Sequence, residues 1–177
     1  MMWRLLSLRA LSLALVLALS AAPAQAVTIW ICWQGSNGYT MSGRMEFPDR
    51  LRDADIITQD DVTAFQITGY RDGIALGSWS LADRQDWQTW YLRYLPREQI
   101  FPTNDRIPGP FDQGWNADGT ATNCGLGGFG FNAGNYAQDF CLDGVWLEES
   151  GMPPPTPFYA LTEAPYIADC SDPALVS

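Results

Sequence analysis

Apolar and polar residues alternate along the stretch that follows residue 26, and this alternation is typical of β-strands. It runs through two segments, residues 27–34 and 39–47, which are separated by the turn-forming residues 35–38. The pattern predicts an antiparallel hairpin with one face toward a core. Its apolar positions are Val27, Ile29, Ile31, Trp33, Tyr39, Met41, Met45 and Phe47.

A second hairpin is predicted over residues 65–81, where the alternation resumes. Asp72 and Gly73 lie at its centre, and both residue types tolerate the positive φ that a two-residue hairpin turn requires. On the returning strand, the apolar residues occupy one set of alternating positions before Gly77 and the other set after it. We therefore expect a β-bulge at this glycine.

The remaining segments are less regular. Residues 87–95 have apolar residues at helical spacing but are rich in strand formers, and we favour a strand. Residues 96–125 are rich in Pro, Gly, Asn and Asp and predict a long irregular loop. Residues 140–147 predict one or two short strands around a central Asp-Gly turn. Residues 152–157 form a stiff proline-rich bridge.

Together these elements predict an all-β fold, an antiparallel β-sandwich or a jelly-roll-like arrangement. Residues 27–177 have the length of a single domain. Residues 1–26 have the features of a signal peptide: early arginines, a short apolar core and the small-x-small sequence that ends at Ala26. We therefore expect cleavage after Ala26 and a periplasmic or secreted domain. Val27 rather than Cys follows, so no lipid or membrane anchor is expected.

Export also changes the interpretation of the cysteines. An even number in an exported chain predicts two disulfides, although the sequence allows three pairings. We favour Cys124–Cys141 as a local bridge and Cys32–Cys170 as a link from the C-terminal region to the first strand. No Cys-x-x-Cys spacing indicates a redox or zinc site.

Charge and composition exclude several functions. The net charge is −10 at pH 7, which disfavours nucleic-acid partners because their phosphates would be repelled. The chain has no histidine and no lysine, which removes Ser-His-Asp, Cys-His and Schiff-base chemistry. Any catalysis would have to come from carboxylates, tyrosine or arginine, and the composition argues against an enzyme.

Two binding sites are candidates within the long loop. Asp112, Asn116 and Asp118 precede Gly119, and oxygen ligands in a glycine-rich turn are those that Ca²⁺ prefers. The alternative is that these side chains cap turns in the backbone, and no other cofactor is expected. Trp115 lies among loop-forming residues and could stack on a sugar, or it could fill the core.

Carboxylate catalysis is the main enzymatic alternative. Glu148 and Glu149 are adjacent, so on a strand they would point to opposite faces and could not act as a pair. Asp60-Asp61 is typical of a solvated turn. Arg93 and Arg97 could form an anion-binding patch, although pairing with surface carboxylates is the simpler interpretation.

A local resemblance supports the fold class. Residues 42–47, residues 57–58, the strand 65–68 and Gly73 are similar to a hairpin pattern in secreted bacterial proteins, many of them sorted by PEP-CTERM tails. The resemblance implies a secreted β-sandwich and assigns no catalytic residues. This chain differs in lacking an apolar helix and a basic tail after the proline-rich bridge.

The sequence thus predicts an exported binding or structural module of the cell envelope or extracellular space, with a glycan or envelope component as a candidate partner. The alternative is a secreted carboxylate-dependent glycoside hydrolase or a carbohydrate-binding protein.

Overall fold

The computed structural model describes residues 25–103, 113–119, 123–134, 136–163 and 170, and within them the chain forms β-strands and two short 3₁₀ turns but no α-helix. The strands are β1 (Ala26–Gln34), β2 (Tyr39–Pro48), β3 (Ile57–Thr58), β4 (Ala64–Arg71), β5 (Ile74–Ser80), β6 (Trp90–Tyr91), β7 (Arg93–Tyr94), β8 (Ile100–Phe101), β9 (Gln113–Trp115), β10 (Phe129–Ala133), β11 (Gln138–Leu142), β12 (Val145–Met152) and β13 (Phe158–Leu161). The 3₁₀ turns cover Asp49–Leu51 and Leu81–Asp83. No helix in this part of the chain has the length and apolar character needed to span a bilayer.

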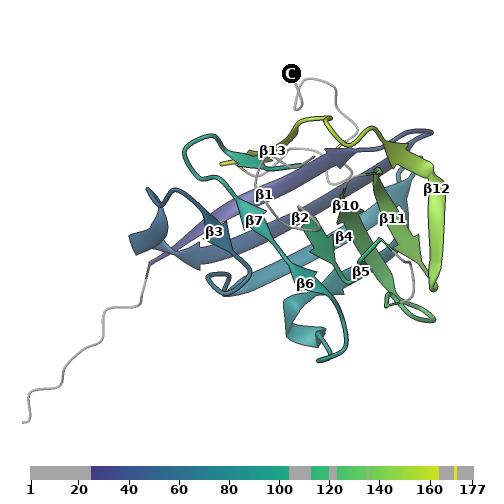
Figure 1. Cartoon of the computed structure of the whole chain (residues 1–177), viewed down its shortest axis with the longest axis horizontal. Coiled ribbons are helices and arrows are strands. Elements are labelled where there is room, and N and C mark those ends of the chain that lie inside the picture. Colours follow the sequence, from purple (N-terminus) through teal and green to yellow (C-terminus); the bar gives the residue numbers. More distant parts are fainter. Residues whose placement is uncertain (1–24, 104–112, 120–122, 135, 164–169, 171–177) are drawn as a thin grey trace, which may run out of the picture.

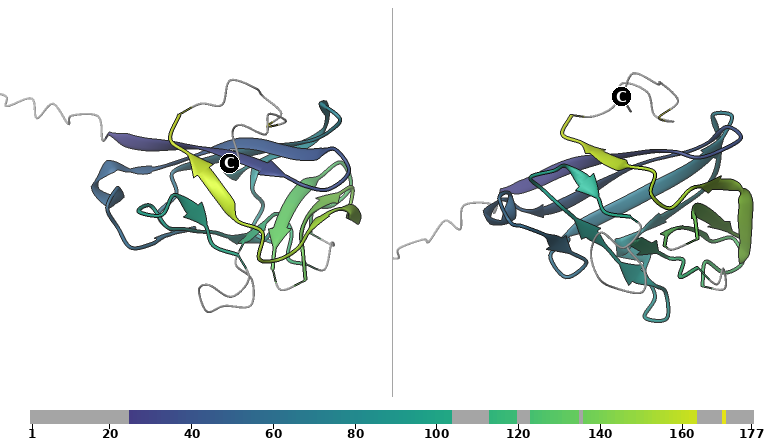
Figure 2. Two further views of the ribbon diagram at one scale, coloured as in Figure 1. Left: turned by 90° about the horizontal axis from the view of Figure 1, so that it is seen from above. Right: turned by 45° about the horizontal axis from the view of Figure 1, so that its top comes forward.

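Two antiparallel sheets stack face to face, which confirms the predicted all-β sandwich (Figures 1 and 2). The first sheet has the order β5-β4-β2-β1-β13-β8, and the second has the order β12-β11-β10-β9-β6. Strands β3 and β7 form a separate pair. The proline-rich bridge connects β12 of the second sheet to β13 of the first, where Gln138 Nε2 donates hydrogen bonds to the carbonyls of Pro154 and Thr156 at 3.2 and 2.6 Å.

The hairpin turns follow the sequence closely. Asp72-Gly73 turns between β4 and β5 with φ values of 51° and 77°, and the equivalent Asp143-Gly144 turn joins β11 to β12 with 52° and 72°. These left-handed conformations are the reason for glycine at the second position. The pairing of β4 with β5 slips by one residue directly beside Gly77, which confirms the predicted bulge.

The core between the sheets consists mainly of aromatic rings. Phe140 of the second sheet lies 5.0 Å from Trp33 and 5.9 Å from Tyr39 of the first, measured between ring centroids. Gly69 leaves room for two rings of the second sheet, because a Cβ atom there would lie 2.3 Å from the Phe129 ring and 3.1 Å from the Phe140 ring. The predicted inward faces of the first hairpin are confirmed, since Ile31, like these rings, is fully buried. Burial of this apolar surface is the main stabilising contribution.

Both favoured disulfides are present. Cys32 on β1 is bonded to Cys170, and Cys124 is bonded to Cys141 on β11, so no cysteine is free. The first bond closes a separation of 138 residues and the second a separation of 17. Two disulfides are compatible with an oxidising compartment.

The structure also shows which elements form in residues 87–95 and in part of residues 96–125. Residues 87–95 contain strands β6 and β7, which confirms the strand interpretation. Residues 96–125 are irregular apart from β8 and β9, and residues 104–112 and 120–122 lie outside the described part. Residues 1–24 of the predicted signal peptide also lie outside it. Cleavage after Ala26 would fall at the first residue of β1.

Candidate functional site

The outer face of the second sheet carries an unusual set of polar residues. On β10, β11 and β12, Phe131, Phe140 and Leu147 face the core, so their neighbours in the strands face outward. Asn132 and Asp139 are paired directly across β10 and β11. Both are at least 95% buried although they lie on the outer face, at 4% and 2% exposure.

A concavity of about 350 Å³ opens beside Asp139, and we call it the β11–β12 concavity. It lies between β11, β12 and two short loop segments. Its lining residues are Gly119, Tyr136, Ala137, Asp139, Trp146 and Glu148. The lining therefore combines two carboxyl groups with two aromatic side chains in one place.

Burial changes the acidity of Asp139. Removal from water raises its pKa from 3.8 to about 7, because the charged form loses hydration. Hydrogen bonds from the side chains of Asn132 and Trp146 lower the pKa and only partly offset this effect. The Asn132 amide nitrogen lies 3.5 Å from Asp139 Oδ1. The Asn132 amide oxygen is buried and has no hydrogen-bond partner among the described residues.

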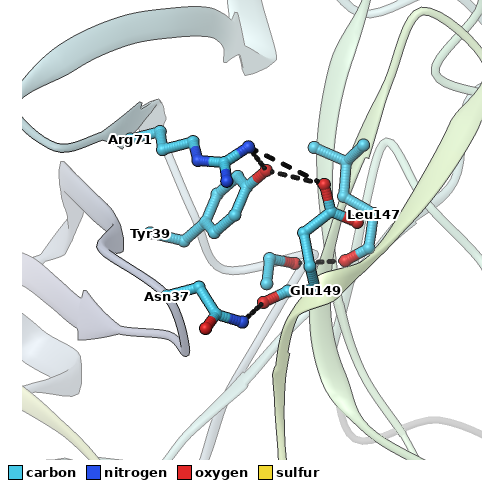
Figure 3. Close-up of polar contacts among 6 residues, drawn as sticks. Asn37, Tyr39, Arg71, Leu147 and Glu149 are labelled. Carbon is cyan, nitrogen blue, oxygen red and sulfur yellow. Dashed lines mark hydrogen bonds and ion pairs between the residues drawn. The ribbon is translucent and has the colours of Figure 1, made fainter.

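The two adjacent glutamates separate as the sequence predicts. Glu148 lines the concavity, whereas Glu149 lies on the other side of β12 and contacts the first sheet (Figure 3). Tyr39 donates a hydrogen bond to Glu149 Oε1 at 3.1 Å, and Arg71 donates one to the Tyr39 hydroxyl at 3.0 Å. Asn37 Nδ2 donates to the Glu149 carbonyl at 2.7 Å. These bonds hold β12 in place and so direct Glu148 toward the concavity.

The electrostatics of this contact are those of an ordinary structural cluster. A hydrogen bond from its own backbone N–H and then the Tyr39 hydroxyl lower the pKa of Glu149. Burial and then the Glu149 carboxylate raise the pKa of Tyr39. The Arg71 guanidinium also lies 4.9 Å from the centre of the Tyr39 ring. We therefore assign this cluster a positioning role.

A disulfide lies in the group of residues against which Trp146, one of the lining residues, is packed. Trp146 packs against a small buried group that contains Ala117, Cys124 and Cys141. The Cys124–Cys141 bond thus fixes the loop before β10 to β11. Because Trp146 rests on this group, the orientation of its indole depends on the bond.

The structure corrects the hypothesis that Trp115 is exposed for sugar stacking. Trp115 lies on β9, is completely buried, and has its ring 4.8 Å from Phe65 and 5.1 Å from Phe131. A ring surrounded by other rings has no face left for a ligand. The glycine- and asparagine-rich neighbourhood in the sequence reflects the tight packing around this strand, where Gly114 has backbone and side-chain neighbours within 3.0 Å of a Cβ position.

The calcium hypothesis remains a prediction, because Asp112 lies outside the described residues. Asn116 is 1% exposed, adopts a positive φ of 52°, and donates its amide to the Phe129 carbonyl at 2.9 Å. Asp118 is half-buried and precedes Gly119, which lines the concavity. In the described part of the chain, no group of three or more His, Cys, Asp or Glu side chains is placed to hold a metal.

The other charged candidates have structural partners. Arg97 pairs with Asp55 at 3.0 Å, and the Arg93 guanidinium lies 4.8 Å from the Tyr91 ring. Asp61 accepts hydrogen bonds from the backbone N–H and the hydroxyl of Thr58, which confirms a turn. These residues do not form a shared site.

Sequence reasoning missed Asp139 entirely. The signal was present, because Asp139 stands between Gln138 and Phe140, both of which are fully buried on the inner face. Alternation therefore places the carboxyl on the outer face together with Cys141. Its burial could not be inferred, because burial depends on contacts between segments that are distant along the chain.

Comparison of the chain with models of known protein families, with curated proteins and with solved structures finds no match.

Proposed function

We propose that this protein is an exported binding module that recognises a carbohydrate at the β11–β12 concavity. The observation that carries this proposal is the position of Asp139, a buried carboxyl group that lines a concave surface beside the partly buried indole of Trp146. Buried polar groups in a cleft are the usual means by which proteins orient a small ligand. The signal-like N-terminal segment and the two disulfides support export.

The lining provides both kinds of contact that a sugar requires. Trp146 is partly buried and Tyr136 is 95% exposed, so each ring has free surface for the apolar C–H face of a pyranose. Asp139 and Glu148 provide carboxyl oxygens that accept hydrogen bonds from sugar hydroxyls. The concavity is shallow and about 350 Å³ in volume, which suits one or two sugar rings of a longer chain.

A glycan array followed by calorimetric titration tests this proposal. Trp146→Ala should reduce the affinity for any glycan that binds by at least about tenfold, because the stacking surface is lost. Trp87→Ala is the matched control, since Trp87 is 62% exposed and does not line the concavity. A glycan that binds equally well to both variants would place its site elsewhere on the protein.

One observation favours a second function, hydrolysis of a polysaccharide. Glycoside hydrolases use one carboxyl group with a raised pKa as the acid and a second one as base or nucleophile. Asp139 has the raised pKa and shares the concavity with Glu148. Release of new reducing ends from a bound polysaccharide, lost in Asp139→Asn and in Glu148→Gln, would establish hydrolysis in place of binding alone.

A further inference from the structure

Asp139 is a buried carboxyl group that has no positively charged partner among the described residues. Burial and the neutral side chains of Asn132 and Trp146 determine its acidity, and no arginine in the described part of the chain contributes. Removing a carboxylate from water without a counter-charge is costly. The raised pKa of Asp139 reduces this cost in the free protein, and a bound cation would stabilise the ionised form of the carboxyl group.

The other residues that line the concavity also favour a positively charged ligand. Glu148 adds a second carboxylate from β12. The rings of Trp146 and Tyr136 face the same space, and the faces of aromatic rings attract cations, most strongly where water is partly excluded. Hydrogen bonds from an ammonium group to a carboxylate are stronger than those between neutral groups.

The whole chain favours the same sign of charge. With 20 acidic residues against 10 basic ones, the net charge is −10. A field of this sign draws cations toward the surface and repels anionic polymers. A glycan that carries carboxylate or sulfate groups would therefore meet repulsion both at long range and in the concavity.

We propose that the β11–β12 concavity binds the protonated amino group of an amino sugar, held by Asp139 and Glu148 and packed against Trp146. This inference rests on the proposed function and narrows the ligand to glycans with free amines. N-acetylation removes the positive charge and leaves the rest of the sugar unchanged. The acetylated sugar is therefore the sharpest comparison.

The experiment titrates three probes into the protein purified from the exported fraction, at neutral pH and low salt. The probes are a glucosamine oligomer, an N-acetylglucosamine oligomer of the same length, and choline as an ammonium compound without a sugar. The free-amine oligomer should bind at least about tenfold more tightly than the acetylated one. Choline should bind weakly and compete with the free-amine oligomer for the concavity.

Two variants test whether the carboxyl groups of the concavity cause the preference for the free amine. Glu148→Gln and Asp139→Asn should each reduce the preference for the free amine, and the exposed position of Glu148 makes its variant safe for folding. Glu46→Gln is the matched control, because it removes the same charge from β2 of the first sheet, where Glu46 lies 3.7 Å from Arg44 and does not line the concavity. It should leave the preference unchanged.

The outcomes separate this inference from the proposed function. Equal binding of the two oligomers would overturn the inference and leave carbohydrate binding in place. Binding of choline alone, reduced in Glu148→Gln, would support the cation site and overturn carbohydrate binding. Binding of none of the three probes would overturn the inference, and the glycan array would then decide the proposed function.

Discussion

The Tyr39 hydroxyl donates a hydrogen bond to Glu149 Oε1 at 3.1 Å and so connects β2 of the first sheet to β12 of the second. Arg71 reinforces this contact through the same hydroxyl and lies 3.8 Å from the Glu149 carboxylate. The connection fixes the direction in which β12 leaves the sandwich. Glu148, the preceding residue, is thereby directed to the opposite face, where it lines the concavity.

Removal of this hydroxyl should weaken the fold modestly. In Tyr39→Phe the ring still packs against Phe140 at 5.9 Å, but the bonds to Glu149 and from Arg71 are lost. We expect the free energy of unfolding in urea to fall by about 1 kcal/mol. Tyr159→Phe, at a half-exposed position, is the control and should leave stability unchanged. An equal effect in both variants would show that the hydrogen bonds contribute nothing.

Asp139 should make stability depend on pH. Its pKa is about 7 in the folded protein against an ordinary value of 3.8, so the folded state holds this proton more tightly than the unfolded state. The stabilisation is therefore complete below about pH 4 and is lost as the pH rises to about 7, with a slope of at most about 1.4 kcal/mol per pH unit. Asp139→Asn should remove this contribution.

The difference in unfolding free energy between Asp139→Asn and the native protein isolates this residue from the other carboxyl groups. Urea titrations at pH 4, 5.5 and 7 should show the variant gaining in relative stability as the pH rises. A constant difference across this interval would contradict a raised pKa.

Trp115 should behave as a core residue. Trp115→Ala would leave a large cavity among Phe65, Phe101 and Phe131 and should cost about 3–5 kcal/mol of stability. The exposed Trp87 is the comparison, and its replacement by Ala should change stability by less than about 0.5 kcal/mol. Thermal unfolding monitored by circular dichroism measures the stability change of each variant. A similar small effect for the two tryptophans would contradict the burial of Trp115.

The two disulfides should have separable roles. Loss of Cys32–Cys170 should cost about 5 kcal/mol and loss of Cys124–Cys141 about 3 kcal/mol, because the longer loop gains more entropy in the unfolded chain. Paired Cys→Ser variants and chemical denaturation test this order. Only the loss of Cys124–Cys141 should also weaken ligand binding, since Trp146 packs against that bond. Free thiols detected by alkylation and intact mass in the native protein would contradict both bonds.

The hairpins could be predicted because their information is local. The alternation around Ile31 and Met45 sets the buried faces, and the Asp72-Gly73 pair sets the turn. The slip beside Gly77 was also visible, since a change of apolar phase within one strand requires an extra residue. The cysteine pairing was favoured correctly because one pair is close in sequence and the other joins the two ends of the domain.

The candidate site could not be predicted in the same way. Trp115 resembled a loop residue because its neighbours are turn formers, yet the sandwich closes around it. Asp139 resembled one solvated acid among many, yet it is only 2% exposed in the folded protein. Glu148 was considered beside Glu149, although its partner in the concavity comes from the neighbouring strand.

By itself the sequence determined the strand type, the turns, the faces of the hairpins and the acidic character of the chain, because each of these depends on residues a few positions apart. Only the tertiary structure decided which side chains lose contact with water. Burial depends on contacts between segments distant along the chain, and burial gives Asp139 its raised pKa and Trp115 its place in the core. The candidate site is therefore a property of how segments distant along the chain pack around the second sheet.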